Sequence, residues 1–203
     1  MGAIAGKVGS IYMKTTASAT AFTTEACTNS GDNTTYYITD ATKRYWDKAT
    51  VPTVYVDASP ETGVTIDYIG GRITFDTPLG GSEAVTVTGE YWTVSELAGF
   101  YNWSLDLTAD LEDSTTFADS GWRTFTPTLK GFTFGAEAYW QDETFQDRLA
   151  EEVVVSLYAN ESNDERYEGF AYISSDSVET PVEGLVQESV EFTGNGELYY
   201  YEL

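Results

Sequence analysis

Histidine is absent from the 203 residues, and cysteine occurs only once, at Cys27. Without histidine the chain lacks the side chain that most often serves as a general base or a zinc ligand. A single thiol cannot form an internal disulfide, and with no histidine to activate it we interpret Cys27 as a structural residue. These absences argue against triad hydrolases, zinc enzymes and disulfide-stabilised scaffolds.

Basic side chains are few: 10 Lys and Arg stand against 33 Asp and Glu, a net charge of −23. A protein that grips nucleic acid needs cations to neutralise phosphates, so this chain should repel DNA. The imbalance lies mainly in residues 101–203, which carry 4 basic and 22 acidic side chains, against 6 and 11 in residues 1–100. High net charge also opposes premature association of the subunit.

Long apolar runs and targeting signals are missing as well. No stretch approaches the roughly 18 consecutive apolar residues of a transmembrane helix. Residues 1–7 are too polar for a secretory leader, and Gly6 breaks the myristoylation pattern. We therefore expect the chain to be made and kept in a cytoplasm.

What is present is the pattern of a mainly β protein. Aromatic residues make up 15% of the chain and Thr and Val are common, a usage that favours strands. One expected strand places Trp103, Leu105 and Leu107 on one side and polar residues on the other. The one expected helix covers residues 141–152, where Phe145 and Leu149 are spaced four apart behind an acidic first turn.

Composition and charge change near Gly99, which we interpret as an organisational boundary. Residues 24–99 contain short alternating runs separated by turn signals, which are typical of a small antiparallel sheet. We interpret residues 1–23 and 100–203 as a core domain, and residues 24–99 as an inserted β-rich subdomain.

Five segments resemble the major tail tube proteins of long-tailed bacteriophages, in the same order and around the expected helix. One of them reads Gly121-Trp-Arg-Thr-Phe-Thr-Pro-Thr-Leu-Lys-Gly131, and another places Tyr139-Trp140 before the helix. The segments are 1–12; 103–110 with 113–117; 121–131; 139–140 with 145–152; and 169–174 with 179–184 and 190–196. The chain departs from the shorter members of that family by residues 24–99.

The resemblance implies a tail tube fold, a β-sandwich or barrel-like core flanked by one α-helix. It further implies hexameric rings that stack into a tube, with an inner wall formed by a β-barrel shared among subunits. A tape measure protein would occupy the lumen first, DNA would pass at ejection, and tail terminator and tail tip proteins would be further partners. The expected location is the virion tail, after assembly in the cytoplasm of the host bacterium.

Four acids fall on the polar sides of second-half strands; we interpret them as residues of the lumen wall, and the alternative is that they are solvated residues on the outside. An acidic wall repels DNA phosphates over roughly 10 Å at 0.1 M salt, so the genome slides without adhering. The four are Asp106, Asp110, Glu137 and Glu191.

Cations are scarce, and four of them are candidates for contacts between subunits, with ordinary surface charge as the alternative for each. Exposed strand edges supply further joints, by pairing with the next copy. Trp122, in the loop 121–123, is expected to bridge neighbouring rings, although a surface Trp can also fasten its own loop. The candidate cations are Arg72, Arg123, Lys130 and Arg148.

Two other classes of function stay open at this point. The first is an Ig-like β-sandwich binding module for a carbohydrate or receptor on a virion or cell surface, with aromatic side chains as a stacking platform. The second is a hydrolase with paired carboxylates, for which no local signature exists. A Gly-rich phosphate loop is absent too. We therefore expect no catalytic residue, no cofactor and no metal site.

Overall fold

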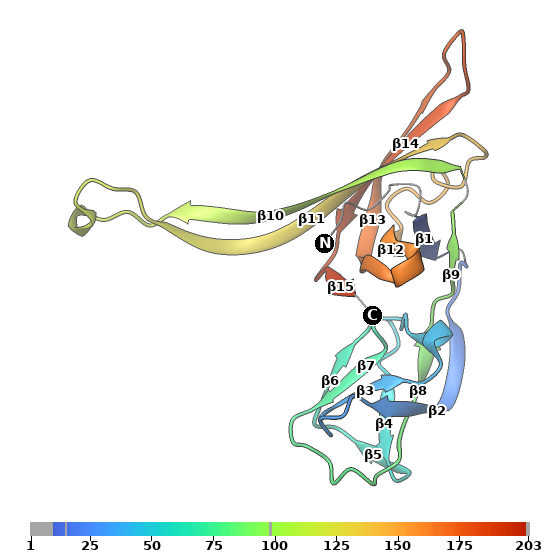
Figure 1. Ribbon diagram of the computed structural model, residues 1–203, viewed down its shortest axis with the longest axis vertical. Helices are drawn as coiled ribbons and strands as arrows, with labels where there is room; N and C mark the ends of the chain where they lie inside the picture. Colours follow the sequence, from blue (N-terminus) through green and yellow to red (C-terminus); the bar gives the residue numbers. More distant parts are fainter. Residues whose placement is uncertain (1–9, 15, 98, 202–203) are drawn as a thin grey trace. The chain divides into compact units, whose positions relative to one another are not determined.

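The computed structural model describes residues 10–14, 16–97 and 99–201, and the described chain is almost entirely β (Figure 1). This confirms the predicted mainly β class. The chain divides into two compact units. We call Tyr12–Glu96 with Val154–Ser156 the barrel unit, and the described residues of Met1–Ile11, Leu97–Val153 and Leu157–Leu203 the arm unit. Residues 1–9 of the first resembling segment lie outside the described residues.

The barrel unit contains a seven-stranded antiparallel sheet of order β5-β4-β8-β2-β3-β7-β6. Only Thr62 and Gly63 separate its two outer strands in the chain, so the sheet curls until it is nearly closed. Asp57 and Ala58 join β4 to β5 with φ of 48° and 64°, the backbone of a primed hairpin turn. The strands are β2 (Thr20–Asn29), β3 (Thr35–Ile38), β4 (Thr53–Val56), β5 (Ser59–Glu61), β6 (Val64–Asp67), β7 (Arg72–Phe75) and β8 (Val85–Tyr91).

The interior of the barrel unit is aromatic and aliphatic. Trp46 is fully buried, with its ring 6.1 Å from that of Phe22, and Tyr36 meets Phe75 edge to face at 5.5 Å. Burying one large apolar side chain contributes about 1.5–3 kcal/mol, so these contacts give the unit a core of its own. The core residues are Phe22, Tyr36, Ile38, Trp46, Val54, Ile73, Phe75, Val85 and Val87.

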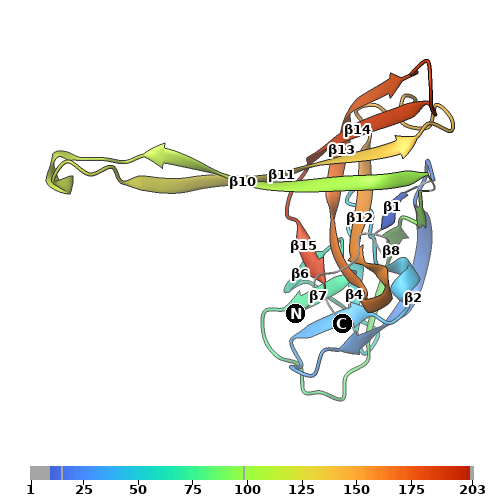
Figure 2. The same cartoon turned by 45° about the horizontal axis from the view of Figure 1, so that its top comes forward.

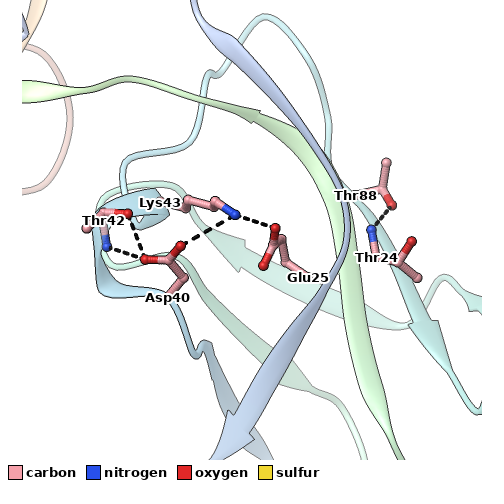
Figure 3. Close-up of polar contacts among 6 residues, drawn as sticks. All are labelled: Thr24, Glu25, Asp40, Thr42, Lys43 and Thr88. Atoms are coloured by element: carbon pink, nitrogen blue, oxygen red, sulfur yellow. Dashed lines mark hydrogen bonds and ion pairs between the residues drawn. The ribbon is translucent and has the colours of Figure 1, made fainter.

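Polar contacts fix the outside of the barrel unit where β2 is bulged (Figure 3). The register of β2 on β8 shifts between Phe22 and Glu25, and Thr24 takes φ of 54°. The bulge takes Thr24 out of the ladder between β2 and β8. Its amide donates instead to the Thr88 hydroxyl at 2.9 Å, so this backbone group keeps a hydrogen bond. Lys43, in the short 3-10 turn η2 (Ala41–Lys43), forms an ion pair with Glu25, and this hydrogen bond raises the pKa of the amine.

The arm unit contributes the long strands of an eight-stranded sheet, in the order β10-β11-β14-β13-β12-β1-β9, with β15 paired to β13. Strand β14 pairs with β11 only from Thr133 to Tyr139. The rest of the β10–β11 hairpin, residues 107–131, is a two-stranded ribbon that we call the arm (Figures 1 and 2). The strands are β1 (Ser10–Lys14), β9 (Val94–Glu96), β10 (Phe100–Asp113), β11 (Phe125–Tyr139), β12 (Glu152–Asn160), β13 (Glu165–Glu179), β14 (Gln187–Gly194) and β15 (Tyr199–Tyr201).

A group of stacked phenylalanines forms the core of the arm unit. The rings of Phe134 and Phe192 are parallel and 4.0 Å apart, and Phe145 meets Phe192 edge-on at 6.3 Å. Gly194 lies against Phe132 so closely that a Cβ there would overlap the ring. This close approach explains the glycine at the end of β14 and fixes the inner boundary of the arm.

The predicted α-helix over residues 141–152 does not form. The amide of Asp147 reaches the Glu143 carbonyl at 3.1 Å, but the next amides donate only three residues back. Ala150 then takes φ of 64° and donates to the Ile173 carbonyl at 2.9 Å, which joins the segment to β13. A helix of so few residues depends on tertiary packing, and here only Phe145 is buried, so pairing with the sheet prevails.

Candidate assembly and channel surfaces

One face of strands β10, β11, β14 and β13 carries hydroxyl, amide and carboxylate side chains in three successive cross-strand rows. Each of these residues is at least partly exposed, and none of them is basic. Side chains of alternate residues share a face, so the rows form one continuous surface, which we call the polar face. The rows are Asn102-Glu137-Ser189-Ser177, Ser104-Gly135-Glu191-Ser175 and Asp106-Thr133-Thr193-Tyr172.

Three of the four acids assigned to the lumen from the sequence lie together on the polar face. Glu137 accepts a hydrogen bond from the Asn102 amide at 3.0 Å, which holds the carboxylate in place. Asp106 and Glu191 line an open hollow of about 240 Å³, whose remaining polar walls come from Ser, Thr and backbone. The polar face therefore concentrates negative charge without a balancing cation.

Asp110 lies apart from the other three acids. The register of β10 on β11 shifts between Ala109 and Leu111, so Asp110 stands in the irregular part of the ribbon. Its carbonyl accepts a hydrogen bond from the Thr128 hydroxyl at 3.3 Å. The structure thus places Asp110 on the arm, beyond the three rows, opposite the point where β11 carries an extra residue.

The opposite face of the same strands is apolar, and it continues past the core. Ala136, Val190 and Phe134 are buried, as alternation requires. Leu107 was expected to join this core but is 65% exposed, because β14 ends before it can cover that row. Farther along the arm, Leu111 and Phe125 continue this face with exposed fractions of 60% and 50%, and Leu129, at the register shift, is 73% exposed.

The loop of residues 114–124, which we call the tip, closes the arm. Thr116 and Asp119 form a capping box around the 3-10 turn η3 (Phe117–Asp119), and these hydrogen bonds lower the pKa of the Asp119 carboxyl. The Trp122 amide donates to the Asp119 carbonyl at 3.0 Å, yet the Trp122 side chain is 80% exposed. Phe117 is fully exposed. Neither aromatic ring packs on its own loop, so Trp122 does not fasten the tip.

The four candidate contact cations fall into two pairs. Arg72 binds Asp67 at 2.6 Å within the barrel unit, and Arg148 binds Glu151 through two nitrogens at 2.9 and 3.2 Å. Arg123 and Lys130 lie exposed on the arm and form no ion pair with any residue in the described ranges. Only the second pair is therefore available to a partner without breaking an internal contact.

A second exposed apolar group lies where β11 finishes, and the sequence analysis assigned it no contact role. The Trp140 amide donates to the Val186 carbonyl at 3.1 Å, which ties the end of β11 to the β13–β14 loop. Tyr139 packs on Tyr101 with ring centroids 4.9 Å apart. We call residues 139–140 and 178–186 the far end; the exposed fractions are 43% for Tyr139, 45% for Trp140, 49% for Val178, 104% for Val182 and 61% for Leu185.

Glu188 is an acid on the apolar side of β14 that the sequence analysis also missed. Glu188 is 5% exposed and lies opposite Ala138 on one neighbouring strand and Val178 on the other. Burial, with added repulsion from Asp176 and Asp142, raises the pKa of its carboxyl to about 7. The alternation gave a signal, because Glu188 stands two residues before Val190, which is buried on that face.

A membrane-spanning helix and a metal-binding cluster are both absent from the described ranges. There, no helix combines the length and the apolarity needed to span a bilayer. No group of three or more Cys, Asp or Glu side chains in the same ranges is arranged to hold a metal ion.

Comparison with known proteins gives likeness only at the level of structure. No protein-family model matches the chain, and no curated protein matches its sequence. A chain from the tail of an empty gene transfer agent particle, solved by helical refinement with C6 symmetry, is 15% identical with a TM-score of 0.45, covering 54% of this chain and 87% of that chain. A chain from the virion of a native gene transfer agent particle is 16% identical with a TM-score of 0.43, covering 53% and 88%.

Proposed function

We propose that this chain is a structural subunit of a phage-type tail tube, whose copies assemble into stacked rings around a channel for DNA. One observation carries the proposal: the β10–β11 hairpin has an acidic polar face and an uncovered apolar face on the same two strands. A subunit that folds only for itself gains nothing from leaving the apolar face uncovered. A tube wall needs both, one for the lumen and one for its neighbours.

Assembly follows from what the arm leaves exposed. An isolated two-stranded ribbon is marginally stable in water, and this one presents Leu107, Leu111 and Leu129 to solvent. Strand β10 is also the outer strand of its sheet, so its unpaired backbone groups can accept another strand. Every copy offers the same surfaces, and a head-to-tail contact that closes by rotation makes a ring, of six copies as the resemblance implies.

Conduction follows from the sign of the charge on the polar face. Each copy would set Asp106, Glu137 and Glu191 toward the lumen, among hydroxyls and without a cation. Phosphates of a passing DNA would be repelled over roughly 10 Å at 0.1 M salt, so they would find no adhesive wall. The tape measure protein would fill this channel before DNA, with tail terminator and tail tip proteins at its two ends.

Electron microscopy of the purified protein tests assembly. We expect rings or tubes that appear with rising concentration. The variant Leu107→Asn with Leu129→Asn should stay monomeric with an unchanged circular dichroism spectrum, because both side chains are already exposed in the subunit. Wild-type protein that stays as isolated globules at high concentration contradicts the proposal and favours the binding module.

Neutralising the polar face tests conduction separately. Asp106→Asn, Glu137→Gln and Glu191→Gln in one chain should preserve tubes and slow DNA ejection from particles that carry them. A matched control, Asp147→Asn with Glu161→Gln and Glu197→Gln, removes the same charge from exposed positions off that face and should eject at the wild-type rate. Equal rates for the two triple variants would exclude the polar face as the lumen wall.

A further inference from the structure

The tip and the far end are exposed apolar groups at opposite ends of one strand. Strand β11 leaves the tip at Phe125 and reaches the far end at Tyr139, a span of 15 residues. At about 3.3 Å per residue the two groups are separated by on the order of 50 Å. They cannot cover each other within one copy, so each requires a partner from outside the subunit.

The tip is organised in advance for binding. The Thr116 amide donates to the Asp119 carboxylate, and the Ser114 amide donates to the Thr124 carbonyl at 3.0 Å, which closes the loop. This network holds the backbone while Phe117 and Trp122 extend into solvent. Rigid aromatic side chains of this kind lose little conformational entropy on docking and dominate the binding energy of many interfaces.

The far end supplies an apolar centre with an acidic rim. Val182 and Leu185 are exposed in the β13–β14 loop, beside Trp140 at the end of β11. The same segments carry the exposed carboxylates of Glu179 and Glu183. An occupant therefore has to bring apolar surface together with positive charge.

Within the arm unit, positive charge is available to a partner only on the arm. Arg148 is bound to Glu151, and Arg166 is buried between Glu168 and Asp164. Arg123 and Lys130 make no ion pair among the described residues, and Arg123 directly follows Trp122. In a chain of net charge −23, the tip is thus the apolar segment that another copy can place against an acidic rim with the least repulsion.

We infer that the tip of one copy docks on the far end of the next, with Phe117 and Trp122 against Trp140, Val182 and Leu185, and Arg123 against Glu179 and Glu183. The inference rests on the proposed assembly function and adds to it a direction, since the contact is head-to-tail and repeats without limit along the tube.

Disulfide trapping between two different variants tests the contact. Ala118→Cys puts a thiol on the tip without removing an aromatic ring, and Thr180→Cys puts one in the far end without removing an apolar side chain; both positions are exposed. The native Cys27 competes little, because burial and Glu25 raise the pKa of its thiol to about 12. Matched controls replace Thr180→Cys with Glu161→Cys, at the other end of β13, or with Thr62→Cys in the barrel unit.

Each variant is mixed with Ala118→Cys under assembly conditions, and the product is examined by non-reducing gel and by microscopy. We expect a cross-linked dimer with Thr180→Cys at least ten times more abundant than with either control. Tubes that form with no such excess, or with the excess at a control site, overturn the inference and leave the proposed function standing. Absence of tubes in the wild type contradicts the proposed function itself.

Discussion

The two units treat their large apolar side chains in opposite ways. Among the described residues, 17 large hydrophobic side chains are exposed; two of them, Tyr37 and Val51, belong to the barrel unit, and the other 15 belong to the arm unit. The barrel unit encloses Trp46 completely, whereas the arm unit presents Trp122 at the end of a ribbon. Similar residue types therefore serve folding in one unit and, on our account, association in the other.

Charge is divided in nearly the same way, between the two halves of the chain. Residues 101–203 carry a net charge of −18 and residues 1–100 only −5. The half of the chain that exposes apolar surface is the half that repels copies of itself most strongly. On our account this combination keeps lone subunits apart while leaving one contact available, because charge repulsion acts in every orientation, whereas the tip and the far end match in only one.

The largest expected effects come from replacing one tryptophan in each unit. Trp46→Ala should lower the free energy of unfolding by about 3–5 kcal/mol, because it empties the core of the barrel unit. Trp122→Ala should change that free energy by no more than about 0.5 kcal/mol, as for other exposed positions. It should weaken assembly by about 2 kcal/mol per contact, or about 30-fold.

Chemical denaturation and light scattering of the two variants measure these effects. A Trp122→Ala protein that forms long tubes as readily as wild type removes the role given to the tip. Val51→Ala, an exposed position of the barrel unit, is the control and should assemble normally.

The next effect in size concerns pH and Glu188. The folded state holds its proton up to about pH 7, whereas the unfolded state releases it near the ordinary value of 4.5. The free energy of unfolding contributed by this group is therefore present below pH 4.5 and is lost as pH rises to about 7. Glu188→Gln should stabilise the protein by about 1–2 kcal/mol at pH 8, and by much less at pH 4.

Denaturation at both pH values measures this difference. Glu191→Gln, on the exposed face of the same strand, is the matched control. Equal gains for Glu188→Gln at pH 4 and pH 8 would mean that burial of the charge is not the cause.

The smallest expected effect is that of salt. Raising the ionic strength from 0.1 M to 1 M shortens the screening length from about 10 Å to about 3 Å. Repulsion between copies then weakens, so the rate of polymerisation should rise severalfold. Light scattering follows the rate, and a lower rate in high salt contradicts repulsion as the main brake on assembly.

Alternation of polar and apolar residues was enough to predict the strands and the polar face. Glu137 and Glu191 lie on adjacent strands in register with Ser189 and Gly135, so a period of two in each strand brought the acids together. The same rule did not show that Asp110 lies beyond these rows, on the arm, beside the register shift of β10 on β11. It failed for Leu107 in another way, since alternation says which side a residue faces but not whether a strand lies opposite.

The helix and the far end could not be predicted for a related reason. Phe145 and Leu149 have helical spacing, but Leu149 is 46% exposed and the segment instead pairs with β13 through Ala150. The far end joins residues 139–140 to residues 178–186, which only the pairing of β11 with β14 brings together. Contacts between segments so far apart in the sequence depend on the order of strands in the sheet, which the local sequence does not determine.

Amide hydrogen exchange, compared between dilute subunit and concentrated protein, tests most directly whether the arm is completed by other copies. The account predicts fast exchange for residues 107–131 in the dilute subunit and strong protection after assembly, while strands β2, β4 and β8 keep the same exchange rates in both states. Arm amides that are equally slow in both states, or that stay fast in assembled material, would contradict it.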